Sequence, residues 1–181
     1  MGRTASVDDE LIHARLAAVF RASGYAGASL SDLSRAVGLQ RASLYHRFPD
    51  GKPAMAAAVL TSMETQFGDI LQPLASEPDV AEMARRMALV YKDGLMACVL
   101  DTMTLSGAPQ GIRDQATRLA RTWLQAMSDA AARAGASEQD AQRRARAALV
   151  RIEGALVVAR VLDDSSVFEQ VLGELPDLLT S

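Results

Sequence analysis

The amino-acid sequence predicts an all-helical protein of about nine helices. Aromatic residues make up only 4% of the 181-residue chain, and alanine is abundant. Strands instead collect aromatic and β-branched side chains, so this composition favours helix. Apolar residues also recur at intervals of three and four along most of the chain, which is the periodicity of amphipathic helices. Because 49% of the residues are apolar and the net charge is only −3, we expect a globular core and almost no β-structure.

The first helix is predicted to begin just after Ser6 and to end at Gly24. Ser6 and Asp9 have the spacing of a capping box, in which two side chains satisfy two backbone amide donors. Apolar residues from Ile12 to Phe20 recur at helical spacing. Gly24 then stops the helix, because glycine adopts the left-handed backbone conformation without a side-chain penalty.

Two short helices joined by a glycine turn are predicted next. Ser29 and Asp32 repeat the capping pattern, and Gly38 breaks the helix that follows. Shortly after this turn, Leu44 and Phe48 lie one helical turn apart. This spacing is that of a helix-turn-helix. A simple helical hairpin has the same spacing, so the pattern alone favours DNA binding and plain packing about equally.

The helix after the glycine turn is expected to direct hydrogen-bond donors outward, with Gln40 at its start. Gln can bridge adenine and Arg can bridge guanine in the major groove, each pair contributing about 1–3 kcal/mol of discrimination. The charge distribution weakly favours DNA binding by the N-terminal segment. Residues 1–52 carry a net charge of +2 and the remainder −5, so a polyanion would bind only at the N-terminal end. The outward residues are Arg41, Ser43, Tyr45 and His46.

Six further helices are predicted in the rest of the chain. Pro53 can occupy the first turn of the fourth helix, because its missing amide hydrogen is not needed there. Pro73 and Pro78 are expected to interrupt the chain after that helix. The predicted ranges are about 53–71, 80–95, 98–105, 112–133, 138–162 and 167–179.

The head of the TetR family of one-component transcriptional regulators is similar to residues 28–55, which read ASLSDLSRAVGLQRASLYHRFPDGKPAM. That head keeps a Thr or Ser opening the second helix, a glycine turn, a Leu-Tyr pair, a Phe three residues later and a nearby Lys. The LmrA/YxaF-like subgroup is similar in its Phe-Pro-x-Gly-Lys loop and in Arg-Ile-Glu-Gly-Ala-Leu at 151–156. The resemblance implies a helix-turn-helix DNA-binding domain at 1–52, and a helical ligand-binding and dimerisation domain at 53–181.

The resemblance also implies a set of DNA contacts. Tyr45 matches a tyrosine that hydrogen-bonds a phosphate, and Lys52 matches a lysine that meets the phosphate backbone at the start of the fourth helix. Ser29 matches the residue that caps the second helix and touches a phosphate, whereas Phe48 matches a packing residue. Gln40 departs from the family, because many relatives have a Ser or Thr cap there. The predicted DNA-binding residues are Ser29, Gln40, Arg41, Ser43, Tyr45, His46 and Lys52.

A homodimer is implied as well, because two heads on a two-fold axis would bind a pseudo-palindromic operator in double-stranded DNA. Small residues on one face of the predicted helix 138–162 would let another helix approach closely. Packing within one chain is the alternative for this face. The predicted dimer residues are Ala148, Ile152, Ala155 and Ala159.

Polarizable side chains in the predicted middle helices suit an adaptable apolar cavity. Core packing is the alternative for each of them, because methionine at helical spacing most often fills a core. By resemblance, the occupant would be a small hydrophobic effector that releases a repressor from DNA. The predicted ligand residues are Met63, Phe67, Met87, Tyr91, Met96, Cys98, Met103, Trp123 and Met127.

The sequence offers little for catalysis, metal binding or membrane insertion. Cys98 is the only cysteine and there are two histidines, so neither an internal disulfide nor a four-ligand Cys/His zinc site can form. We expect no catalytic site, metal or cofactor. A signal-peptide pattern and an apolar run of about 20 residues are both missing, so a cytoplasmic protein with no membrane partner is expected. The alternative function is a helical small-molecule-binding module without DNA binding.

Overall fold

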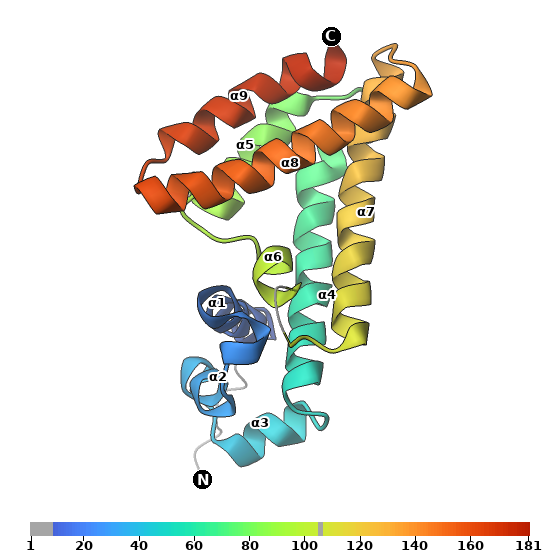
Figure 1. Cartoon of the computed structure of the whole chain (residues 1–181). Coiled ribbons are helices and arrows are strands. Elements are labelled where there is room, and N and C mark those ends of the chain that lie inside the picture. The colour runs from blue at the N-terminus through green and yellow to red at the C-terminus, as the bar shows by residue number, and fades with distance from the viewer. Residues whose placement is uncertain (1–8, 105–106) are drawn as a thin grey trace. The chain divides into compact units, whose positions relative to one another are not determined.

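The computed structural model describes residues 9–104 and 107–181, which form helices and connecting turns without a strand (Figure 1). The predicted all-helical fold is thereby confirmed for these residues, and most helix ends agree to within a few positions. None of the helices described is long and apolar enough to cross a membrane. The elements are α1 (Asp9–Gly27), α2 (Leu30–Val37), α3 (Arg41–Arg47), α4 (Lys52–Leu71), the 3₁₀ helix η1 (Gln72–Leu74), α5 (Val80–Tyr91), α6 (Val99–Thr104), α7 (Gln110–Arg133), α8 (Glu138–Leu162) and α9 (Ser166–Thr180).

The helices are divided between two compact units. The first unit contains α1, α2, α3 and α6, together with residues 52–64 of α4 and residues 110–116 of α7. The second unit contains α5, α8 and α9, with the remainder of α4 and α7. This division groups α6 with the N-terminal helices. The predicted domain boundary between residues 52 and 53 stays a prediction.

α1 changes direction at Gly24, where the sequence predicts its end. Gly24 has a φ of 66° and a ψ of 175°, and helical structure resumes as far as Gly27. A β-carbon on Gly24 would stand 3.0 Å from the carbonyl oxygen of Thr102 in α6. The glycine therefore kinks the helix beside α6, and the predicted end at this residue is corrected to a kink. The predicted N-cap, Ser6, lies outside the described residues.

The helix-turn-helix forms where the sequence predicts it. The N–H of Gly38 donates to the carbonyl oxygens of Ser34 and Arg35, which ends α2. The hydroxyl of Ser34 donates to the carbonyl oxygen of Leu39, which closes the turn before α3. The apolar side chains that the two helices bury are Leu33, Val37 and Leu44.

The second unit is organised around α9, which packs against α8 and α5. Phe168 of α9 is fully buried, and its ring centroid lies 6.3 Å from that of Tyr91 at the end of α5. α5 ends at Tyr91, earlier than the predicted range of 80–95, because the next three residues all take positive φ values. That turn places Gly94 directly against the Phe168 ring.

Candidate nucleic-acid interface

α3 exposes polar side chains on one face and buries the side chain of Leu44 on the opposite face. Leu44 is only 1% exposed, and its burial determines which way this seven-residue helix faces. Tyr45 is 42% exposed although it is aromatic. The outward orientation predicted from the spacing is therefore found in the structure, whereas contact with DNA stays a prediction. The other exposed members of the predicted set are Gln40, Arg41, Ser43 and His46.

Ser29 caps α2, as predicted. Its Oγ accepts a hydrogen bond from the backbone N–H of Asp32 at 3.1 Å and donates to the Asp32 carboxylate at 2.6 Å. The hydrogen bond from the Ser29 hydroxyl, assisted by the Arg35 guanidinium at 3.2 Å, lowers the pKa of Asp32. Ser29 is exposed at a helix N-terminus, where backbone N–H groups favour an anion.

The sequence did not reveal two interactions on this side of the first unit. The guanidinium of Arg41 donates to Oγ of Ser31, which links α3 to α2. Arg47, in the last turn of α3, forms an ion pair with Asp9 at the start of α1. Neither pair lies within one helix, so helical spacing could not indicate them. Gln40 makes no capping hydrogen bond at the start of α3, which agrees with its departure from the family pattern.

The ring of Tyr45 leans on the turn that precedes α4. Gly51 is buried in that turn with a φ of 66°. A β-carbon on Gly51 would stand 3.3 Å from Cε1 of Tyr45, so a larger residue would be both strained and crowded. The turn therefore packs against one part of the tyrosine ring, while another part of the ring stays exposed.

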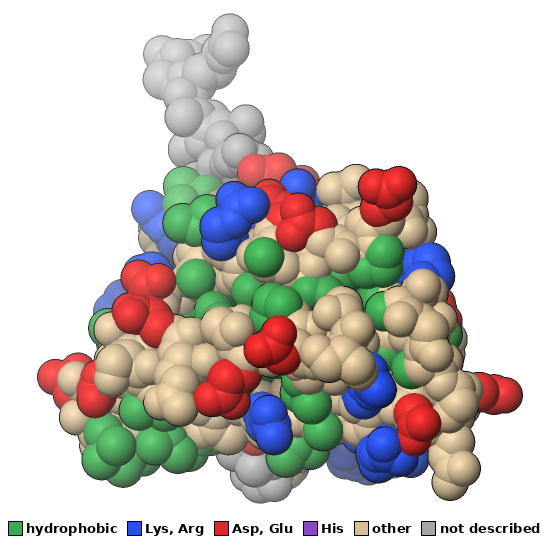
Figure 2. All heavy atoms as spheres, turned by 90° about the horizontal axis from the view of Figure 1, so that it is seen from above, with side chains coloured by type: hydrophobic (Ala, Val, Ile, Leu, Met, Phe, Trp, Pro, Cys, Tyr) green, Lys and Arg blue, Asp and Glu red, His purple; other side chains and the backbone are tan. Residues whose placement is uncertain are grey.

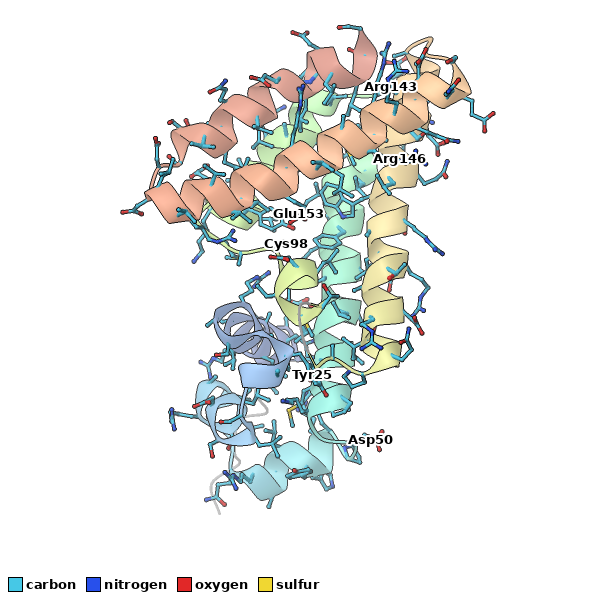
Figure 3. All side chains as sticks on the ribbon, in the orientation of Figure 1. Tyr25, Asp50, Cys98, Arg143, Arg146 and Glu153 are labelled. Carbon is cyan, nitrogen blue, oxygen red and sulfur yellow. The ribbon has the colours of Figure 1, made fainter. Side chains whose placement is uncertain are left out.

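Lys52, a further predicted DNA contact, has an ammonium group that is hydrogen-bonded to backbone oxygens within the first unit. Its Nζ donates to the carbonyl oxygens of Tyr25 at 2.8 Å and Ala28 at 3.1 Å, and lies 3.5 Å from that of Ala26. The same atom lies 4.6 Å from the centroid of the Tyr25 ring, a cation–π distance. Figure 3 shows Tyr25 beside the first part of α4. The phosphate contact of Lys52 stays a prediction.

Two family models match the chain. One, described as bacterial regulatory proteins, tetR family, matches residues 12–59. The other, described as transcriptional regulator LmrA/YxaF-like, C-terminal domain, matches residues 79–174, which is more than half of the chain. The chain belongs to the TetR family, in its LmrA/YxaF-like subgroup. Both of its domains are therefore those of DNA-binding transcriptional regulators.

A Bacillus subtilis (strain 168) protein, the uncharacterized HTH-type transcriptional regulator YezE, is 30% identical to this TetR family chain over 97 residues. The match covers 54% of this chain and 48% of that protein. The chain thus spans about half the length of this relative.

Several solved structures share the fold. A regulator from Legionella pneumophila has a TM-score of 0.84 at 19% identity, over 98% of this chain and all of that one. Reduced NemR from E. coli has a TM-score of 0.76 at 17% identity, over 96% and 98% of the two chains. A cysteine mutant of CifR, complexed with 26-base-pair double-strand operator DNA, has a TM-score of 0.74 at 21% identity, over 98% of each chain. At these identities the likeness shows the fold alone.

The predicted ligand residues of this TetR family chain are divided between the two units. Met63 and Met103 belong to the first unit, where Sδ of Met63 accepts a hydrogen bond from Arg21 at 3.5 Å. Both methionines are buried, which supports the core-packing alternative for them. The other seven residues belong to the second unit: Phe67, Met87, Tyr91, Met96, Cys98, Trp123 and Met127.

Within the second unit, several predicted ligand residues contact one another. The rings of Phe67 and Trp123 meet edge to face with centroids 5.3 Å apart. The Tyr91 hydroxyl lies 3.8 Å from Sγ of Cys98, and both side chains are buried. A groove of about 590 Å³ lies elsewhere in this unit, along α7 and α8, and contains none of the predicted ligand residues. Ligand contact by the buried set stays a prediction.

The predicted dimer residues lie on the inner face of α8. Ala148, Ile152, Ala155 and Ala159 are at most 4% exposed within a single chain, which supports the alternative of packing within one chain. Their contact with a second subunit stays a prediction. Figure 2 shows hydrophobic side chains gathered at the lower left corner, where the C-terminal end of α8 lies. The large apolar residues exposed on α8 are Val150, Val157, Val158, Val161 and Leu162.

The described residues give little indication of metal or thiol chemistry. Among them, no three His, Cys, Asp or Glu side chains lie together in an arrangement that could hold a metal ion. The thiol of Cys98 is buried. Members of this family are transcriptional regulators, and the exposed polar surface of α3 is the feature of this chain that fits such a role.

Proposed function

We propose that this protein is a ligand-responsive transcriptional repressor that binds a pseudo-palindromic operator as a homodimer and is released by a small hydrophobic molecule. The observation that carries the proposal is the exposed polar row of α3, held outward by the buried side chain of Leu44. Such a helix can enter the major groove of DNA. The cytoplasm, where chromosomal DNA is found, is the compartment that this function requires.

The proposed DNA contacts differ in what they recognise. Gln40 and Arg41, at the start of α3, are proposed to contact base edges, because amide and guanidinium groups form bidentate pairs with adenine and guanine. Ser29 and Tyr45 are proposed to contact phosphates, which position the protein without reading sequence. The complex of CifR with operator DNA supports this use of the shared fold.

The proposed homodimer uses the exposed apolar face of α8. Val150, Val157 and Val161 lie seven and four residues apart, so they share one side of the helix, and they are 71%, 44% and 77% exposed. Gly154 falls between them and would let a second helix approach closely. Burial of each valine side chain would contribute about 1.5–3 kcal/mol at most. This face replaces the predicted set centred on Ile152 as the proposed interface.

The proposed effector binds the second unit among its buried polarizable side chains, near Tyr91 and Cys98. A ligand shifts a conformational equilibrium only if it binds one state more tightly than the other. Effector and operator are therefore expected to weaken one another by the same factor. Equal operator affinity with and without a tightly bound ligand would remove this part of the proposal.

Fluorescence anisotropy tests DNA binding directly. The intact protein is titrated against DNA from the region upstream of its own gene and against scrambled DNA. The Tyr45→Ala and Arg41→Ala variants are expected to lose at least about tenfold in affinity. Arg41→Ala removes a base contact of about 1–3 kcal/mol, and Tyr45→Ala removes a hydrogen bond to a charged phosphate, which contributes about 1.5–3 kcal/mol. The matched control is Arg85→Ala, which removes an exposed arginine of α5 in the second unit. Binding no tighter than to scrambled DNA would favour a small-molecule-binding module without DNA binding.

A further inference from the structure

We infer that Lys52 is a positioning residue of the DNA-binding unit: its ammonium group holds the first turn of α4 to the end of α1 and does not itself bind a phosphate. This inference rests on the proposed DNA binding and assigns a different role to one of its predicted contact residues. It concerns residues of the first unit only.

The hydrogen-bonding capacity of Lys52 is already used. An ammonium group has three donors and no acceptor. In Lys52 these donors face three backbone oxygens at 2.8, 3.1 and 3.5 Å, and the group also lies 4.6 Å from the Tyr25 ring centroid. A phosphate could bind the ammonium only by displacing some of these partners. Lys52 is also only partly exposed, whereas Arg41 of α3 is exposed.

The partners of Lys52 are acceptors that α1 leaves unsatisfied. Carbonyl groups in the last turn of a helix have no amide partner within it and form the negative end of the helix dipole. Tyr25 and Ala26 lie in the last turn of α1, and Ala28 follows directly. A cation at this position is therefore stabilising, and it comes from the first residue of α4.

Lys52 lies between two of the proposed phosphate contacts. Ala28, whose carbonyl accepts from Lys52, directly precedes Ser29, the N-cap of α2. Gly51, which directly precedes Lys52, supports the ring of Tyr45. One ammonium group thus joins the segment that carries Ser29 to the segment that supports Tyr45, and it determines their separation.

The Lys52→Met variant tests this role, because methionine keeps an aliphatic stem and removes the charge and the donors. Operator affinity is measured by anisotropy over a series of salt concentrations, at a temperature where circular dichroism shows both proteins folded. We expect about tenfold weaker operator binding. We also expect the slope of log affinity against log salt to match that of the wild type. A slope smaller in magnitude by about 1.8, which is about 0.9 for each subunit of the proposed dimer, would mean that a phosphate contact was lost and would overturn the inference.

A substitution of Tyr25, which contacts Lys52, tests the same role without removing a charge. Tyr25→Leu removes the ring beneath the ammonium, and Tyr25 is buried, so it cannot contact DNA directly. We expect Tyr25→Leu to weaken operator binding without changing the salt slope, and to add little to Lys52→Met in the double variant. Losses that multiply independently would overturn the inference.

Amide hydrogen exchange of the free protein separates this inference from the proposed function. Lys52→Met is expected to speed exchange in residues 25–28 and at Met55, whose N–H donates to the carbonyl oxygen of Gly51, without any DNA present. If the wild type binds no operator but the variant shows this change, DNA binding fails and the role of Lys52 within the unit stands. Unchanged exchange would overturn the role of Lys52 whether or not DNA binds.

Discussion

Ser29 and Ser137 occupy equivalent positions before α2 and α8. Each hydroxyl accepts a hydrogen bond from the backbone N–H of an aspartate three residues later and donates to the carboxylate of that aspartate. Only Ser29 lies on the proposed DNA-binding surface, whereas Ser137 belongs to the second unit. The two serines can therefore separate the stability of a helix cap from recognition of a phosphate.

Replacing Ser29 by alanine is expected to lower the free energy of unfolding by about 1 kcal/mol, because one backbone amide loses its acceptor. Ser137→Ala is expected to have a similar effect. Operator affinity should fall for Ser29→Ala only. Urea unfolding and anisotropy measure the two quantities, and an equal loss of DNA binding in both variants would contradict the phosphate contact.

Acid is expected to weaken both caps. Hydrogen bonds from Ser29 and Ser137 lower the pKa values of Asp32 and Asp140. A depressed pKa in the folded state stabilises the protein above the ordinary pKa of the carboxyl group, and this stabilisation is lost as pH falls through the depressed value. The urea midpoint of Asp32→Asn should therefore depend less on pH below about 4 than that of the wild type. A pH profile identical to the wild type would argue against this linkage.

At the scale of the element, α1 contains a kink at Gly24. The sequence predicted an interruption at this glycine but not that the helix continues beyond it. Gly24 combines a positive φ with a close approach to the carbonyl oxygen of Thr102. Gly68 of α4 is an exposed helical glycine, and a β-carbon there would meet nothing within 4 Å. The two glycines are therefore a matched pair for measuring what the kink requires.

Gly24→Ala is expected to lower the free energy of unfolding by about 1–3 kcal/mol, because an L-residue is strained at a positive φ combined with an extended ψ. The crowding against α6 adds to this loss. Gly68→Ala is expected to raise the free energy of unfolding by about 0.5–1 kcal/mol, because alanine restricts the unfolded chain. Chemical denaturation measures both, and a stabilised Gly24→Ala variant would show that α1 tolerates a straight path at this point.

Gln40 gives α3 a helix start without a side-chain cap. Gln40→Ser is expected to stabilise the first unit by about 0.5–1 kcal/mol, because serine can accept a hydrogen bond from an early N–H of the helix. Operator affinity should nevertheless fall, since a proposed base contact is removed. Thermal unfolding and anisotropy on the same sample test both effects, with Gln40→Ala as the variant that removes the amide without adding a cap.

At the scale of the whole molecule, the proposed dimer depends on which face of α8 remains exposed. The inner face is covered within one chain, and valines occupy the outer face. Leu89 of α5 is also exposed, at 80%, but it lies outside this face. Its replacement by glutamate is therefore a control for the replacement of exposed valines by glutamate.

Val150→Glu combined with Val157→Glu is expected to convert dimers into monomers, because apolar burial would be replaced by unpaired charge. Operator affinity should fall with dimerisation, since a monomer occupies one half-site only. Leu89→Glu should leave dimerisation and operator affinity unchanged. Sedimentation velocity measures the assembly, and a dimer that survives the double substitution would place the interface elsewhere.

Helix positions, the glycine turn and the outward face of α3 were determined by the sequence alone. These features depend on groups within a few residues of one another: Ser29 with Asp32, Gly38 with the end of α2, and Leu44 with its helical neighbours. The spacing of residues along the chain predicts such local hydrogen bonds and the helical repeat directly. Family motifs added the proposed use of this surface.

Only the tertiary structure decided the partners of Lys52 and the buried face of α8. Lys52 meets carbonyl groups more than twenty residues earlier, which a pattern of spacings cannot reveal. The sequence predicted a dimer contact for the face of α8 that contains Ile152, with packing within one chain as the alternative. In the structure this face is buried, whereas Val150, Val157 and Val161 stay exposed. Both outcomes depend on contacts between segments far apart in the chain, and those contacts exist only once the helices pack.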